Sequence, residues 1–104
     1  MSDGFLEHVL DQLGGEVTAR AMFGGHGLYH GGAMFGIVYD DAVYFKVDDR
    51  TRPLYESAGS SCFAPRPRQR LTSFFDVPAD VLDDRDALVA WAAGAQEAAR
   101  AGRR

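Results

Sequence analysis

Two short turn signals constrain the fold of this chain more than any other feature. Gly31-Gly32 and Asp40-Asp41 divide the stretch HGLYHGGAMFGIVYDDAVYFKV into three largely apolar runs. A two-residue hairpin turn needs positive φ angles, which glycine adopts without steric cost and aspartate tolerates. The spacing therefore predicts two successive hairpins and a three-stranded antiparallel meander. The alternating residues 17–23 are expected to join it as a fourth strand.

Apolar residues at helical spacing predict a helix at each end of the chain. The first is expected to begin at a Ser2 or Asp3 cap and to end at Gly14-Gly15. The last is expected to span about 16 residues, with Asp83 as its cap and Asp86 in the reciprocal position of a capping box. Its narrow apolar stripe consists of Leu88, Trp91, Ala92, Ala95 and Ala99.

The residues between the meander and the last helix are less regular. A short helix is expected to begin at Asp49 or Thr51 and to end at Gly59. The segment SSCFAPRPRQR is expected to be a loop or an extended passage because of its two prolines, and LTSFFDV a further strand. The sequence thus predicts an α+β fold, in which an antiparallel meander of three to five strands packs in two layers with N- and C-terminal helices.

Length and composition predict a single domain spanning residues 1–104. The chain has 46% apolar and 25% charged residues, as ordinary folded soluble proteins do. Its one cysteine, Cys62, allows no internal disulfide, and the acidic N-terminus lacks the features of a signal peptide. No run of apolar residues is long enough to span a membrane. We therefore expect a cytoplasmic protein without a membrane partner.

The glycine-rich residues 22–36 raise the alternative of a phosphate-binding loop, which their details contradict. His30 replaces the third glycine of a dinucleotide fingerprint. The Walker-A spacing is present, but Ala33 and Met34 stand where lysine and serine or threonine must hold phosphate and magnesium. The stretch also leads into a predicted strand, so it offers no helix N-terminus to an anion. No cofactor is expected.

Two histidines in the same stretch leave open a small-ligand or metal site. His26 and His30 are four residues apart on a predicted strand and are expected to share a face, where Cys62 or His8 could complete a ligand set. Cα atoms four residues apart on a strand lie roughly 13 Å apart, too far to share one ion without a bend. We expect no stoichiometric metal.

Candidate catalytic groups have simpler structural explanations. The paired acids lie where turns and helix caps favour aspartate, at Asp40-Asp41, Asp48-Asp49 and Asp83-Asp84. No hallmark of an activated nucleophile surrounds Ser57, Ser60, Ser61 or Cys62. We expect a protein that is not an enzyme.

Alternating arginines are the best case for nucleic-acid binding. In an extended segment they would share one side and could contact a phosphate backbone or an acidic partner. A direct nucleic-acid binder would use Arg66, Arg68 and Arg70 together with the basic tail Arg100, Arg103 and Arg104. However, the formal net charge of −4 gives the chain no global positive field. We expect no tight DNA binding.

Several motifs together resemble the N-terminal domain of the TfoX/Sxy proteins, which are bacterial competence regulators. The resemblance covers residues 17–98. Its most specific parts are MFGG at 22–25, the pair Gly27 and Tyr29, Met34-Phe35, YFKVD at 44–48, and Val77-Pro78 before a helix that holds Trp91. It implies a small α+β domain with an antiparallel sheet and no catalytic residue set to transfer. Full-length members add a helical C-terminal domain, which this chain is expected to lack. The resemblance therefore implies a protein-binding or assembly module, linked to transcriptional regulation through a partner.

Pairing through the two turns predicts which side chains share a face. Gly27 is expected opposite Gly36 and Leu28 opposite Phe35, so that two facing glycines leave a flat spot for close packing. The helices are expected to cover Tyr29, Met34, Val38, Val43, Phe45 and Val47. The other side is expected to carry Leu28, Phe35, Ile37, Tyr39 and Tyr44, fringed by Lys46, His26 and His30.

That second side is apolar enough to need a cover. Five large apolar side chains exceed what a monomer usually exposes. We therefore expect an interaction surface for a second copy, in a homodimer, or for a protein partner. The alternative is that the two terminal helices divide and cover both faces.

Overall fold

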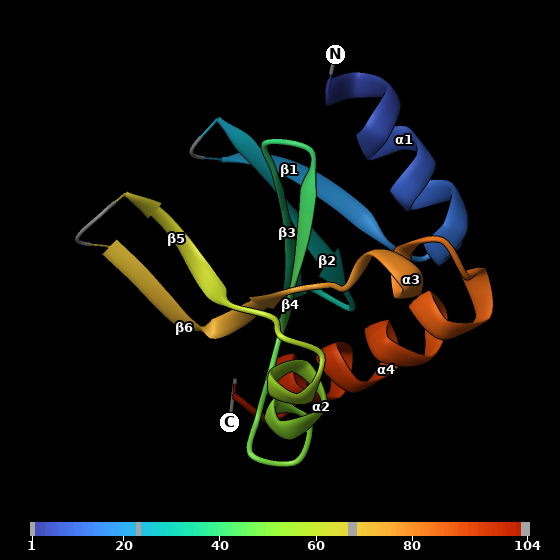
Figure 1. Ribbon diagram of the computed structural model, residues 1–104. Coiled ribbons are helices and arrows are strands. Elements are labelled where there is room, and N and C mark those ends of the chain that lie inside the picture. The colour runs from blue at the N-terminus through green and yellow to red at the C-terminus, as the bar shows by residue number, and fades with distance from the viewer. Residues whose placement is uncertain (1, 23, 67–68, 103–104) are drawn as a thin grey trace.

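The computed structural model describes residues 2–22, 24–66 and 69–102, except the side chains of residues 2, 3, 65, 66 and 69. Over these residues the helices are α1 (Ser2–Leu13), α2 (Arg52–Ser57), α3 (Ala79–Leu82) and α4 (Arg85–Ala101). The strands are β1 (Thr18–Met22), β2 (Gly25–His30), β3 (Ala33–Tyr39), β4 (Ala42–Lys46), β5 (Cys62–Arg66) and β6 (Gln69–Asp76). They form one antiparallel sheet in the order β1-β2-β3-β4-β6-β5 (Figure 1). The predicted α+β fold is confirmed, with six strands in place of three to five.

Both predicted hairpin turns are present. Gly31 and Gly32 have φ angles of 60° and 83°, and Asp40 and Asp41 have φ angles of 52° and 60°. Two successive positive φ angles are typical of the type I′ turn, whose twist matches that of the flanking strands. These turns fix the order of β2, β3 and β4.

A β-bulge in β3 makes part of the predicted register wrong. Next to the turn, Tyr29 pairs with Met34 as predicted, but Leu28 pairs with Gly36. Phe35 is therefore an additional residue in β3 with no counterpart in β2. Beyond it, Gly27 lies opposite Ile37, so the predicted pair of facing glycines does not exist.

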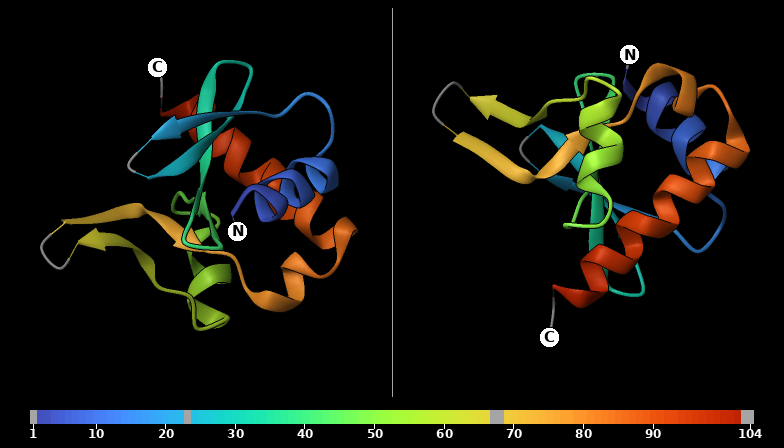
Figure 2. Two further views of the ribbon diagram at one scale, coloured as in Figure 1. Left: turned by 90° about the horizontal axis from the view of Figure 1, so that it is seen from above. Right: turned by 60° about the horizontal axis from the view of Figure 1, so that its bottom comes forward.

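The inner face of the sheet, defined as the side that α1 and α4 cover, carries the main core (Figure 2). Its buried strand residues are Leu28, Ala33, Phe35, Val38, Val43 and Phe45, followed by Val47. The prediction thus assigned the side chains of β4 and of the second half of β3 to the correct faces of the sheet. It assigned those of β2 and of the first half of β3 to the wrong faces. Leu28 and Phe35 lie on the inner face, and Tyr29 and Met34 lie on the outer face.

The outer face is covered by the sheet itself. A small outer core buries Ile37 against Phe63 and Phe74 of the β5–β6 hairpin. The rings of Tyr39, in β3, and Phe63, in β5, are 5.3 Å apart, although β4 and β6 lie between these strands in the sheet. Three strand spacings span about 14 Å in a flat sheet. The sheet therefore curls strongly over its own outer face.

The segment with the two prolines contributes to this cover. Residues 62–66 form β5 rather than a loop, with Pro65 inside the strand. Because β5 is the last strand of the sheet, its free edge tolerates a residue without an N–H donor. Of the two expected forms, a loop or an extended passage, residues 62–66 adopt the extended one, and Pro65 does not prevent a regular strand there.

Helix α4 differs from the prediction at its start. Asp84, rather than Asp83, is the N-cap, and its side chain accepts a hydrogen bond from the Ala87 N–H at 3.2 Å. Asp83 instead ends α3, a single turn that was not predicted. The buried stripe consists of Leu88, Ala92, Ala95, Ala98 and Ala99.

The other helices follow the prediction. Helix α1 ends before Gly14, whose φ angle is 100°, and α2 has Pro53 in its first turn. The predicted capping side chains of Ser2 and Asp3 lie outside the described part of the structure. Within residues 2–22, 24–66 and 69–102, no helix is long and apolar enough to cross a lipid bilayer.

Candidate functional site

The predicted interaction surface is largely internal to the chain. Leu28 and Phe35 are fully buried in the main core, and Ile37 is 1% exposed in the outer core. Only Tyr39, Tyr44 and Lys46 remain half-buried. The β5–β6 hairpin covers the outer face, whereas the prediction considered only the helices or a second chain. The outer face around Ile37 is therefore not a free surface.

The half-buried outer-face residues pack against the hairpin. The Tyr44 ring lies 4.6 Å from that of Phe63, and Lys46 Nζ lies 5.4 Å from the centre of the Phe74 ring. Burial, together with the nearby carboxylates of Asp76 and Asp40, raises the pKa of Tyr44. Its hydroxyl is thus a neutral donor, which suits the edge of a core rather than acid–base catalysis.

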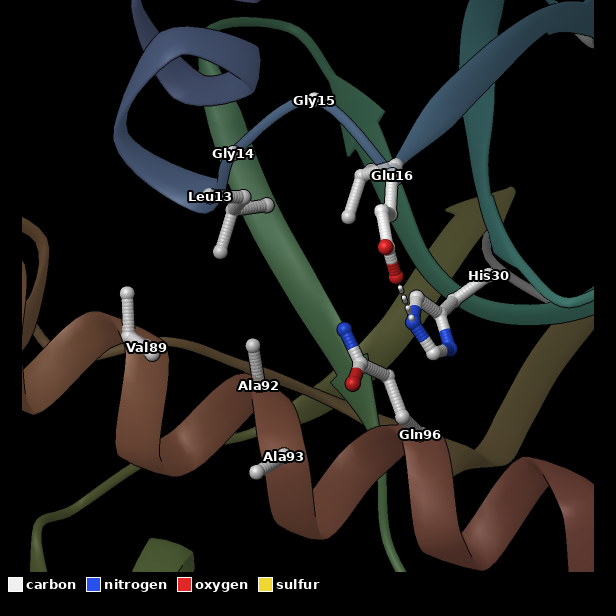
Figure 3. A pocket seen from close by; sticks show the side chains of 10 residues that line it. Leu13, Gly14, Gly15, Glu16, His30, Val89, Ala92, Ala93 and Gln96 are labelled. Carbon is white, nitrogen blue, oxygen red and sulfur yellow. Dashed lines mark ion pairs between the residues drawn. The ribbon is translucent and has the colours of Figure 1, made fainter.

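A first hollow, of about 260 Å³, lies between the α1–β1 connection, the end of β2 and α4. Figure 3 shows Glu16 and His30 pointing toward each other above α4, whose residues Ala92, Ala93 and Gln96 also line the hollow. The distance from His30 Nε2 to Glu16 Oε1 is 3.6 Å. When the imidazole is protonated, this contact is an ion pair, and the hollow then has a balanced charge.

The histidines occupy one face, as predicted, but it is the inner one. Strand alternation places His26 and His30 on the same side as Leu28, with His30 paired to Ala33. His30 Nδ1 is buried without a hydrogen-bond partner. Among the residues that the structure describes, no three histidine, cysteine or acidic side chains gather as a metal site would require. Cys62 and His8 do not line this hollow.

A second hollow lies between α2 and α4 and is mainly apolar. Its volume is about 250 Å³, and it is lined by Thr51, Leu54, Tyr55, Ala90, Trp91 and Gly94. The rings of Tyr55 and Trp91 meet edge to face at 4.7 Å and form its floor. Burial raises the pKa of Tyr55. Leu54, at the rim, is 55% exposed, more than any other large apolar side chain in the described part of the chain.

Gly94 shows why this second hollow is open. A Cβ at position 94 would lie 3.3 Å from Thr51 Cγ2, so a side chain there would crowd the contact between α4 and α2. The sequence patterns considered above did not predict this hollow. The available signals were Leu54, an aliphatic residue on a short helix, and the lone tryptophan at position 91.

A third hollow lies between α2 and the β5–β6 hairpin. It has a volume of about 590 Å³ and is lined by Arg52, Glu56, Ser60, Ser61, Cys62, Arg70, Thr72 and Phe75. Arg70 Nη2 donates to Cys62 Sγ at 3.5 Å. The lining of the third hollow thus contains two guanidinium groups, one carboxylate, three hydroxyls and the thiol.

The predicted nucleic-acid residues are only partly described. Arg70 lines the third hollow, and Arg100 lies 4.0 Å from Glu97 on α4. The side chain of Arg66, and all of Arg68, Arg103 and Arg104, lie outside the described residues. The shared arginine face therefore remains a prediction.

The paired acids have structural contacts where the structure describes them. Asp40 and Asp41 form a turn, and Asp84 caps α4. Asp48 Oδ1 accepts hydrogen bonds from the backbone N–H groups of Arg50 and Thr51 at 3.0 and 3.1 Å. These contacts are what loop and cap aspartates normally make.

Comparison with known proteins gives one family. The model of the TfoX N-terminal domain matches residues 8–99 of the 104-residue chain, a span that includes the whole sheet and most of α4. No curated protein matches the chain. The resemblance drawn from the sequence motifs is confirmed, since the match covers well over half of the chain. The chain therefore belongs to the TfoX N-terminal domain family, a family of competence-related regulatory modules.

Proposed function

We propose that this chain is a non-enzymatic protein-interaction module that acts in competence-type transcriptional regulation through a cytoplasmic protein partner. The single observation that carries the proposal is the apolar hollow between α2 and α4, with the exposed Leu54 at its rim. Its volume of about 250 Å³ is below the range of roughly 300–1,000 Å³ that is usual for small-molecule pockets. The occupant is a large aliphatic or aromatic side chain on a segment of the partner protein.

Burial of that side chain supplies the binding energy. The edge-to-face pair of Tyr55 and Trp91 offers a rigid apolar floor, and aromatic residues in such positions are typical of binding hot spots. Leu54 would lose its exposed surface on binding. The site replaces the outer-face surface that the sequence predicted, because the chain itself covers that face.

The absence of catalysis and of tight DNA binding is part of the same proposal. Asp40 and Asp41 form a turn and Asp84 caps a helix, and the net charge of −4 disfavours a nucleic-acid partner. Of the two alternatives, direct nucleic-acid binding depends on arginines that are mostly outside the described residues. A small-ligand site would use the Glu16–His30 hollow.

The test compares two charge substitutions, at the two large apolar side chains that are exposed in the described part of the chain. Leu54→Glu changes the rim of the α2–α4 hollow, and Val89→Glu is the matched control, since Val89 is 44% exposed on α4 and does not line that hollow. A partner is identified by affinity purification from native cells, and its binding is then measured by calorimetry with purified proteins. We expect Leu54→Glu to weaken binding about tenfold or more and Val89→Glu to leave it within about twofold.

Three results would contradict the proposal. One is equal binding by both variants. Another is a nanomolar complex with duplex DNA. The third is a stable homodimer, by sedimentation, that Leu54→Glu leaves intact and that excludes other proteins.

A further inference from the structure

The third hollow is suited to a different kind of ligand. It lies on the other side of α2 from the apolar hollow, and Figure 2 shows α2 beside the base of the β5–β6 hairpin. The two faces of the hairpin have different chemistry. One face sends Phe63, Leu71 and Phe74 into the outer core. The other presents Cys62, Arg70, Thr72 and Phe75 to the hollow.

We propose that this hollow binds a small organic anion, with the guanidinium of Arg70 pairing with its carboxylate or phosphate group. This inference does not depend on the proposed protein-binding function. Its volume of about 590 Å³ lies within the usual range for small-molecule sites, roughly 300–1,000 Å³.

Charge supports an anionic ligand. The lining contains two arginines and one acid, Glu56, in a chain whose net charge is −4. Arg52 is already paired with Asp49, at 3.1 Å. Arg70 makes no ion pair with any described residue, and the one side-chain hydrogen bond it makes there is to Cys62. A thiol uses only one of the five N–H donors of a guanidinium group, which leaves a planar fork for a carboxylate or phosphate.

The rest of the lining fits the remainder of such a ligand. Ser60, Ser61 and Thr72 line the same hollow, and their hydroxyls can donate to anionic oxygens or accept from ligand hydroxyls. Half-buried Phe75 provides an apolar wall for a hydrocarbon or aromatic portion. The site therefore fits a ligand with one anionic end and one apolar end.

The experiment uses three probes at constant ionic strength: phenyl phosphate, inorganic phosphate and benzoate. Binding to the full chain is followed by amide chemical shifts in two-dimensional NMR. We expect saturable shifts at Ser60, Ser61 and Thr72 with phenyl phosphate or benzoate, and the stronger of the two identifies the anionic group. Inorganic phosphate, which has no apolar end, is expected to bind more weakly.

Two arginine variants locate the site. Arg70→Gln is expected to weaken binding about tenfold or more, the loss typical of a charge-assisted hydrogen bond. Arg85→Gln, at an exposed arginine on α4 outside the hollow, is expected to leave it within about twofold. Thr72→Val is a second test, which retains Arg70 and should also weaken binding. It decides the question in the case that Arg70→Gln impairs folding.

Cys62 provides an independent readout, because it is the only cysteine in the chain. Bound phenyl phosphate should slow its alkylation by iodoacetamide in the wild type but not in Arg70→Gln. The proposal is overturned if no probe gives saturable shifts, or if Arg70→Gln and Arg85→Gln bind alike. Shifts confined to the Glu16–His30 hollow would also overturn it.

Discussion

At the scale of single residues, this chain uses aspartate mainly to hold backbone. Asp40 and Asp41 occupy positive-φ turn positions, and Asp48 accepts hydrogen bonds from the N–H groups of Arg50 and Thr51, just before α2. These roles could be predicted from the sequence, because turn and cap chemistry depends on only a few neighbouring residues. The predicted capping box, with Asp83 as the cap and Asp86 as its reciprocal partner, was wrong because adjacent aspartates offer two equivalent local choices and Asp84 is the cap.

The pH dependence of stability should report on Asp48. Burial alone would raise its pKa, but the N–H of Thr51 and the Arg50 guanidinium outweigh burial and hold the pKa below its usual value. A carboxyl with a lower pKa in the folded chain stabilises that state above the unfolded pKa of about 3.9. This stabilisation is lost as pH falls through the lower, folded pKa.

Asp48→Asn should therefore lower the free energy of unfolding at pH 7 by about 1 kcal/mol. The difference from the wild type should shrink as the medium becomes strongly acidic, as measured by urea unfolding over a pH series. Asp49→Asn is the control, because its fully exposed carboxylate makes only a surface ion pair. A constant difference at all pH values would show that Asp48 acts through packing and not through its charge.

At the scale of elements, the sequence predicted α1, the meander, α2 and α4 but not the register of β3. The residues AMFGIV are apolar on both sides of the strand, so alternation gives no information about which side faces the helices. The bulge at Phe35 decides which residues of β3 face the helices, and the sequence pattern gives no sign of this bulge. Strand β5 was missed for another reason. Proline is excluded from central strands but not from edge strands, and the sequence does not show that β5 lies at an edge.

The start of α4 gives a direct test at this scale. Asp84→Ala should destabilise the protein by about 1 kcal/mol, because the N–H of Ala87 loses its acceptor. Asp83→Ala removes the aspartate that the sequence suggested as the cap and should change stability by less than about 0.5 kcal/mol. Thermal unfolding of the two variants decides between them. Equal losses would mean that both aspartates contribute to the cap.

At the scale of the whole molecule, one sheet serves two cores. The helices cover the inner face, and the curled β5–β6 hairpin covers the outer one. An apolar outer face was correctly predicted, but its cover was not. The cover comes from residues far along the chain, and no local pattern shows that a sheet will curl. The three hollows likewise arise from packing between distant elements. The sequence could therefore point to some of their residues one by one but not to their grouping in a hollow.

The outer core predicts an unequal pair of alanine substitutions. Ile37→Ala should cost about 2–5 kcal/mol, because Ile37 is 1% exposed and its removal leaves a cavity beside Phe63 and Phe74. Val89→Ala, at a side chain that is 44% exposed, should cost less than about 0.5 kcal/mol. Both values come from urea unfolding. If Ile37→Ala instead dissociated an oligomer without loss of stability, a second chain and not the hairpin would cover the outer face.

The bulge in β3 also bears on how the length of this domain can vary. Phe35 is an insertion into an otherwise regular ladder, since Met34 and Gly36 pair with consecutive residues of β2. If Phe35 were deleted, Gly36, Ile37 and Val38 would keep their faces and their partners in β2. The inner core would lose one aromatic ring and nothing else from β3. Omission of a residue at this position would thus keep the register of both hairpins, and its cost would be the loss of the buried Phe35 ring from the inner core.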